Sequence, residues 1–264
     1  MIIIIVFTLI LITLIISFYF RFNKRDNFIY TTPKILDISS EIIQIEEIPK
    51  KLMQTYISYD KVPKKVFNNI KKFAGNYEYS FFDHNTRYNF IKDNYDKSVL
   101  DAYNNLENLA HKSDLFRYCY LYINGGVYLD IKIELLKPLD LIFSDNYTYT
   151  ALSIVRNTVC QGIISTPPKN KIFLDLIEYA KTLPKNIHYH TFTRDFYTKI
   201  KNDIGNDLTP GINIGKDMSY YLFQEKCTSN PKDCYDGLDN KGLCCFIYDN
   251  DIPIIKVRYS DYPW

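Results

Sequence analysis

Charged residues occupy every second position in one short stretch, at Asp130, Lys132 and Glu134. Side chains alternate between the two faces of a strand, so a strand over 127–135 places these three on one face. Such a row is costly to bury, and ligands of open α/β sheets bind at the carboxyl ends of strands. The row therefore predicts a binding or catalytic site. An edge strand with one solvated face is the alternative.

A second pair of charged residues precedes that strand. Asp114 and Arg117 stand three residues apart in a predicted helix that begins at Ser113 and ends at Gly125-Gly126. The pair offers an acceptor and a forked donor on one helix face, which suits a ligand rich in hydroxyl groups. An exposed ion pair within the helix, worth a few tenths of a kcal/mol, is the alternative.

These residues must be positioned by the elements around them. From residue 48 onward, strand-like and helix-like segments alternate, which predicts an α/β fold with a largely parallel sheet. The expected strands cover 52–57, 77–82, 127–135, 151–155 and 161–165, and the expected helices follow Pro63 and cover 88–95, 98–110, 113–123 and 172–183.

The amino-terminal segment has the composition of a membrane anchor. Residues 2–20 carry no charge and as a helix would span roughly 28 Å, enough to cross a bilayer. A cleaved signal peptide is the alternative, but no basic region precedes the run. We expect an anchor over 1–25, a stem over 26–47 and a folded domain over 48–264. Basic residues after the span place that domain on the cytoplasmic side.

Four clustered cysteines bear on the same question. Cys227, Cys234, Cys244 and Cys245 fall within nineteen residues. A disulfide-stapled loop would require an oxidising compartment, so a Golgi or ER lumenal domain is the alternative location. Zinc binding and free thiols in a reducing cytosol are the other possibilities. A glycosylation sequon at Asn146 does not decide between the two sides.

Composition excludes several classes of protein. The 264 residues are 47% hydrophobic and 23% charged, which excludes a mainly disordered or coiled-coil chain. A formal net charge of +2 without a basic cluster argues against a nucleic-acid partner.

The stretch from Ser113 to Asp130, SDLFR followed by LY, GGVY and the acid, resembles the core motif of a glycosyltransferase family. This family contains the yeast-type α-1,6-mannosyltransferases, the capsular polysaccharide synthesis enzymes and, more distantly, the glucosyltransferase domains of clostridial toxins. Residues 48–56 resemble its first strand, although Met53 stands where a histidine is usual. The resemblance covers about 48–140. It implies a GT-A fold of Rossmann-like type, a nucleotide-sugar donor and a retaining mechanism.

The resemblance also implies roles for individual residues. Asp114 and Arg117 would bind hydroxyls of the donor sugar, and Asp130 matches the first acid of the DxD motif, which faces the ribose and a divalent metal such as Mn²⁺ or Mg²⁺. Gln54, Thr55 and Tyr56, after the first strand, and Gly125, Gly126 and Tyr128, around the second motif, would line the donor site. Tyr56 would stack on the base, with an ordinary core or surface tyrosine as the alternative.

Lys132 departs from the family pattern, because it replaces the second acid of the motif. An ammonium repels a divalent metal and attracts a diphosphate. Three interpretations remain: Lys132 neutralises the leaving diphosphate, Glu134 supplies the missing metal ligand beside Asp130, or catalysis is lost.

The sequence thus predicts a membrane-anchored retaining glycosyltransferase that moves a sugar to a glycan or protein acceptor. A noncatalytic binding protein on the same scaffold is the alternative. The metal would bind weakly, no organic cofactor is expected, and the composition is compatible with a cellular or a viral source.

Overall fold

The computed structural model describes residues 47–259. The expected anchor over 1–25 and nearly all of the expected stem over 26–47 lie outside the described residues. Within 47–259, no helix is long and apolar enough to cross a membrane.

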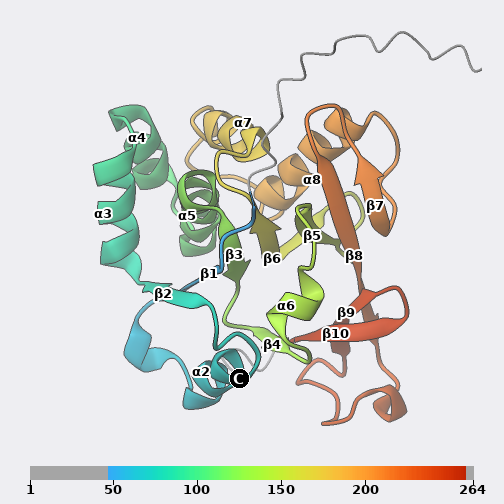
Figure 1. Cartoon of the computed structure of the whole chain (residues 1–264). Helices are drawn as coiled ribbons and strands as arrows, with labels where there is room; N and C mark the ends of the chain where they lie inside the picture. The colour runs from blue at the N-terminus through green and yellow to red at the C-terminus, as the bar shows by residue number, and fades with distance from the viewer. Residues whose placement is uncertain (1–46, 260–264) are drawn as a thin grey trace, which may run out of the picture. The chain divides into compact units, whose positions relative to one another are not determined.

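The folded unit contains ten strands and seven α-helices among its described residues (Figure 1). The strands are β1 (Lys51–Thr55), β2 (Glu78–Phe82), β3 (Gly126–Leu129), β4 (Ile133–Leu135), β5 (Thr148–Leu152), β6 (Val159–Thr166), β7 (Gly211–Ile214), β8 (Ser219–Thr228), β9 (Cys244–Asp249) and β10 (Ile252–Val257). The helices are α2 (Lys64–Phe73), α3 (His84–Asn94), α4 (Lys97–Asn105), α5 (Leu109–Asn124), α6 (Leu139–Ile142), α7 (Lys171–Ala180) and α8 (Thr191–Ile204).

The strands form one mixed sheet in the order β2-β1-β3-β6-β5-β8-β9-β10-β4, with β7 beside β8. The pairs β1–β2, β1–β3 and β5–β8 are parallel, and the remaining pairs are antiparallel. The expectation of a largely parallel sheet is therefore wrong. Part of the cause lies after α8, where β7 to β10 follow one another without an α-helical crossover, because short connections join antiparallel strands. The antiparallel pairs β3–β6 and β5–β6 arise before α8.

The sheet curls back on itself near the predicted site residues Asp130 and Lys132. β3 is third in the strand order and β4 is last, yet only residues 130–132 separate them in the chain. So short a connection requires β4, at the end of the strand order, to approach β3. The predicted single strand over 127–135 is accordingly wrong: Ile133 donates its backbone N–H to the Asp130 carbonyl at 2.9 Å, which makes a turn there.

Alternating side chains on the strands enter two cores on opposite faces of the sheet. Met53, Tyr128 and Ile164 pack with α5, α7 and α8 in one core. Leu52 and Ile163, each adjacent to one of these in the chain, belong to the other core, which includes residues of α2 and α6. Figure 1 shows α3, α4, α5, α7 and α8 together at one side of the sheet, with α2 and α6 apart from them.

Two disulfides close the carboxyl-terminal part of the sheet. Cys227–Cys245 joins β8 to β9, and Cys234–Cys244 closes the intervening loop. The four clustered cysteines thus form the stapled loop, rather than a zinc site or free thiols. Cys119 and Cys160 are buried and take part in no disulfide.

Candidate functional site

Helix α5 carries the first pair of predicted site residues. Its N-cap is Asn108, whose side-chain oxygen accepts the Ala110 N–H at 2.8 Å, so the helix begins a full turn before the predicted start at Ser113. Gly125 at its carboxyl end has a φ of 60° and a ψ of −156°, a conformation that glycine adopts more readily than other residues. Asp114 and Arg117 lie in the middle turns of this helix and are therefore held on a rigid element.

Strand β3 follows directly and brings the third residue to the same place. Gly126 opens it with a φ of 87°, and a Cβ there would lie 2.6 Å from the Lys51 carbonyl oxygen of β1. Only glycine allows the two strands to approach so closely. Asp130 comes immediately after β3, where its N–H donates to the Gly162 carbonyl of β6 at 2.9 Å.

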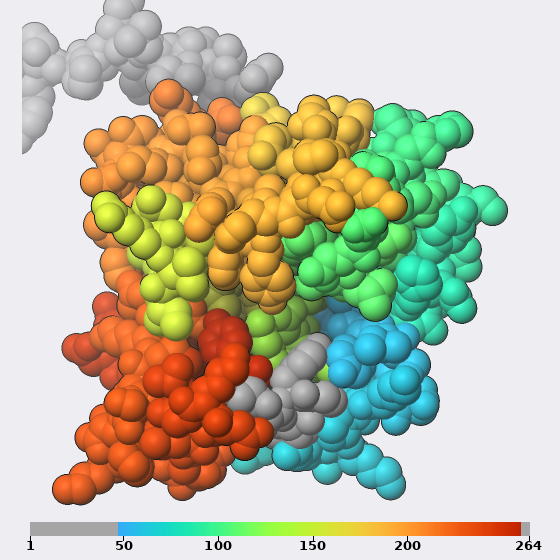
Figure 2. Space-filling view, turned by 180° about the vertical axis from the view of Figure 1, so that it is seen from behind, coloured from blue at the N-terminus to red at the C-terminus, as the bar shows by residue number. Residues whose placement is uncertain are grey.

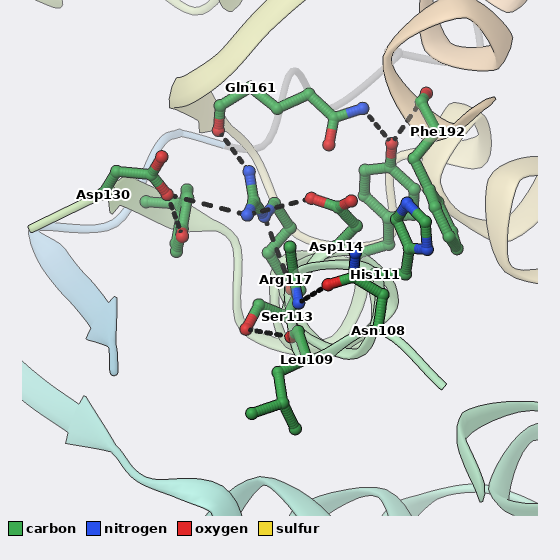
Figure 3. Close-up of polar contacts among 12 residues, drawn as sticks. Asn108, Leu109, His111, Ser113, Asp114, Arg117, Asp130, Gln161 and Phe192 are labelled. Atoms are coloured by element: carbon green, nitrogen blue, oxygen red, sulfur yellow. Dashed lines mark hydrogen bonds and ion pairs between the residues drawn. The ribbon is translucent and has the colours of Figure 1, made fainter. Parts of the chain in front are cut away.

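Arg117 lies between the two predicted carboxylates and contacts both. Its Nη2 is 3.0 Å from Asp114 Oδ1 and 3.6 Å from Asp130 Oδ1. Its Nη1 donates to the Gln161 carbonyl at 2.7 Å, and its guanidinium stacks over the Tyr128 ring at 4.3 Å. Figure 3 shows Asp114 and Asp130 on opposite sides of this guanidinium. The motif residues separated in sequence by sixteen positions thus form one charged cluster.

Lys132 completes the cluster from the turn after β3. Its Nζ is 3.2 Å from Asp130 Oδ2, on the carboxylate oxygen that Arg117 does not approach. The same ammonium lies over the Tyr259 ring at 4.8 Å. Two carboxylates and two cations therefore balance within the cluster, in which the Arg117 side chain is 7% exposed and that of Lys132 23%.

The two carboxyls of the cluster are shifted in opposite directions. Burial raises the pKa of Asp114, and Arg117 only partly opposes this. Burial alone would also raise the pKa of Asp130, but Lys132, Arg117 and the Tyr128 hydroxyl outweigh it and hold that pKa below its usual range. As the pH falls, Asp114 is thus the first of the two to take a proton.

Glu134 is engaged elsewhere. Its Oε2 accepts from Arg258 Nε at 2.8 Å and from Arg258 Nη2 at 2.5 Å. Arg258 also pairs with Asp236 at 2.6 Å, in the disulfide-closed loop. The break between β3 and β4 removes the shared strand face on which the sequence reasoning aligned Asp130, Lys132 and Glu134.

The remaining predicted donor-site residues divide into two groups: four residues with side chains, and two glycines. Gln54 is buried beside the cluster and donates to the Asp130 carbonyl at 3.4 Å, and the Tyr128 hydroxyl donates to Asp130 Oδ1. Thr55 is buried and donates to the Phe82 carbonyl at 2.6 Å, while Tyr56 packs beside Val62 and Val66.

The second group comprises Gly125 and Gly126. They lie at the amino end of β3, away from Asp130, and a Cβ on Gly125 would lie 2.5 Å from the Pro168 nitrogen. Close backbone packing accounts for both glycines.

Some members of the site carry no local sequence signal. Gln161 contributes a main-chain carbonyl, which any residue could supply. Tyr259, near the carboxyl end, lies over Lys132 and donates its hydroxyl to the buried Glu225. A buried acid in the middle of the long strand β8 was the one signal that could have indicated this network.

The residues present do not fit a divalent metal. The Asp130 carboxylate already contacts two cations, and Glu134 is held by Arg258. In the described part of the chain, no group of three or more acidic, histidine or cysteine side chains is placed to hold a metal ion.

The chain is similar to known glycosyltransferases. Residues 60–149 match the family described as the glycosyltransferase sugar-binding region containing the DXD motif. The chain is 27% identical over 224 residues to a protein of Acanthamoeba polyphaga mimivirus named uncharacterized glycosyltransferase L373, covering 77% of this chain and 89% of that protein. The PaToxG glycosyltransferase structure matches with a TM-score of 0.43 and 13% identity, over 61% of this chain and 71% of that one. The matched region and the viral relative both support a glycosyltransferase of the family whose sugar-binding region contains the DXD motif.

Proposed function

We propose that the chain is a retaining glycosyltransferase of GT-A type that uses a nucleotide-sugar donor and a glycan or protein acceptor. The observation that carries the proposal is the bridge from Asp114 through Arg117 to Asp130. It joins a helix face able to bind sugar hydroxyls to the turn at the end of β3, where a diphosphate would lie. A single buried guanidinium thus supports both halves of one donor site.

Lys132 is the group we assign to the leaving diphosphate. Negative charge develops on that group as the glycosidic bond breaks, and preorganised cations stabilise it. The ammonium is held by Asp130 at 3.2 Å and by the Tyr259 ring, so it is oriented before substrate binds. Burial opposes the charge, but Asp130 raises the pKa of Lys132 above its ordinary value. It therefore stays cationic at neutral pH.

The direct test is turnover of a panel of nucleotide sugars by the full-length chain in detergent. We expect release of the nucleoside diphosphate from at least one donor, and loss of that release in Asp130→Asn. The same panel decides the alternative of a noncatalytic binding protein: donor that binds without turnover in the wild-type chain would favour it.

We also propose that residues 2–20 anchor the protein in a membrane, on the basis of their uncharged sequence. Full-length protein that is released from membranes by carbonate washing would refute the anchor. The basic residues after the span predict a cytoplasmic domain, whereas the two disulfides support a lumenal one. We favour the lumenal side, because disulfides persist in oxidising compartments. Asn146 is exposed, so its glycosylation, detected by an endoglycosidase gel shift, tests this choice.

A further inference from the structure

A pocket of about 390 Å³ lies next to the charged cluster but outside it. Helix α5 supplies one wall through Glu107, Asn108 and His111, at and just before its first turn. The segment between α7 and α8 supplies the other wall, mainly through Lys185, Asn186 and Tyr189. Pockets that bind small molecules typically measure about 300–1,000 Å³. This one is therefore large enough for a ligand.

The pocket continues the line of the proposed donor site along α5. His111 precedes Asp114 by three residues, and Asn108 precedes it by six, so all three lie near one face of the helix. At 1.5 Å per residue, these steps are about 4.5 and 9 Å along the axis. Figure 3 shows His111 on the same side of Arg117 as Asp114, with Asp130 on the other side. If Asp114 holds the donor sugar, the next space along the helix lies on the side away from the diphosphate.

The outer wall is fixed at two points, one on α5 and one just before it. His111 Nε2 lies 3.3 Å from the Tyr189 carbonyl oxygen, and Lys185 Nζ lies 2.8 Å from Glu107 Oε1. Figure 2 shows the corresponding gold and green segments meeting, with the surface hollowed beneath their junction. Tyr189 is 61% exposed, and it is among the groups that, after Asp130, raise the pKa of Lys132. Its ring thus lines the pocket and is open to solvent.

The lining has the chemistry of a site for a neutral sugar. Glu107 and Lys185 pair with one another, so the pocket walls carry no net charge from them. The side-chain amide of Asn186 offers both donor and acceptor atoms for hydroxyl groups, and Asn108, whose oxygen caps α5, offers its amide N–H groups. Tyr189 offers an exposed aromatic face, which packs well against the apolar face of a pyranose ring.

We propose that this pocket is the subsite for the acceptor, and that it takes a neutral saccharide whose ring packs on Tyr189. The proposal rests on the assignment of the donor sugar to Asp114. It makes Tyr189 the specificity-determining residue for the acceptor, and it predicts that the transferred sugar meets the acceptor hydroxyl between Asp114 and Tyr189.

The test is ligand-observed saturation-transfer NMR on the full-length chain, with methyl glycosides of glucose, mannose, galactose and N-acetylglucosamine and with methyl glucuronide. We expect at least one neutral glycoside to bind the wild type. Tyr189→Ala should weaken its binding at least tenfold, and Tyr189→Trp should retain it. Tyr235→Ala removes a tyrosine of similar exposure (63%) on the disulfide-closed loop and is the matched control.

Several outcomes would overturn the subsite: no neutral glycoside binds, only the glucuronide binds, or Tyr189→Ala binds as the wild type does. Thermal unfolding of each variant checks that the fold is intact. Nucleotide-sugar turnover is measured separately and judges the proposed function. If glycoside binding depends on Tyr189 but the chain shows no turnover, the saccharide site is supported and the proposed transferase function is refuted.

Discussion

Arg117 and Asp130 come from different elements, and their contact at 3.6 Å joins helix α5 to the turn after β3. Because Arg117 also holds Asp114 at 3.0 Å, neither carboxylate can be repositioned without the guanidinium. Arg117, which the sequence predicts to contact the ligand, thus also holds the other charged residues of the site in place.

Replacement of Arg117 should therefore affect both stability and activity. Arg117→Ala leaves two largely buried carboxylates without their shared cation, which typically costs about 3–5 kcal/mol. Arg117→Lys should retain part of the stability but lose transfer, because an ammonium cannot reproduce the forked geometry. Urea unfolding and donor turnover measure the two effects. Lys171→Ala, which breaks an exposed pair with Asp175, is the control and should change neither by much. An Arg117→Ala protein as stable as the wild type would contradict the structural role.

The acid side of the pH profile should report Asp114. Its pKa is raised and that of Asp130 is lowered, so as the pH falls Asp114 loses its charge first. A protonated carboxyl accepts sugar hydroxyls less well, and donor binding should weaken at a pH above the ordinary Asp range of about 3.9. Titration of a nucleotide sugar across pH 4–8 measures this. In Asp114→Asn we expect weaker binding without that acid limb, and an unchanged limb would assign it to another group.

Lys132 should make turnover largely independent of metal. We expect residual transfer in the presence of a chelator, because the ammonium stabilises the departing diphosphate itself. Lys132→Ala should lower transfer by about 10²–10³-fold, the usual cost of removing one preorganised donor. Lys132→Asp places a third carboxylate beside a single remaining cation, so this variant should gain dependence on Mn²⁺ or Mg²⁺. Wild-type activity abolished by chelator and restored by metal would refute the assignment.

Asp195 offers a test of stability away from the site. Burial raises its pKa to about 6, and among the described residues its Oδ2 is buried without a hydrogen-bond partner. A folded-state pKa above the unfolded value favours the protonated form, so the stability it contributes is lost as the pH rises from about 4 to 6. Asp195→Asn should therefore stabilise the protein by about 1–2 kcal/mol at pH 7.5, after allowance for solvent screening, and have little effect at pH 4.

The measurement for Asp195→Asn is the midpoint of thermal or urea unfolding at both pH values. Asp93→Asn, an exposed replacement on α3, controls for the change in net charge. Equal stabilisation at pH 4 and pH 7.5 would show that titration of Asp195 is not the cause.

The order of elements from α5 to β3 could be predicted because its signals are local. The glycine cap, the helical spacing of Asp114 and Arg117, and the strand that follows are all short-range features. The break after Leu129 could not be predicted in this way. Asp130, Ile131 and Lys132 include no glycine or proline, and their polarity continues the alternation of a strand.

Long-range packing decides that turn. Ile131 is fully buried beside Val62 and Val66, and the Arg258 N–H donates to the Lys132 carbonyl at 3.0 Å. The partner of Glu134 is likewise 124 residues away in the chain. Such partners leave no trace in local periodicity, which is why the metal-ligand interpretation of Glu134 followed naturally from the sequence alone.

In the three-residue connection between β3 and β4, the structure constrains the number of residues more than it constrains their side chains. Because it closes the curled sheet, an insertion or deletion there would pull β4 out of register with β10. The side chains of Asp130 and Lys132, by contrast, project into the site without setting that register. The motif is thus fixed in length but open in composition. A substitution at Lys132 should therefore change the charge of the cluster while leaving the backbone that carries it unchanged.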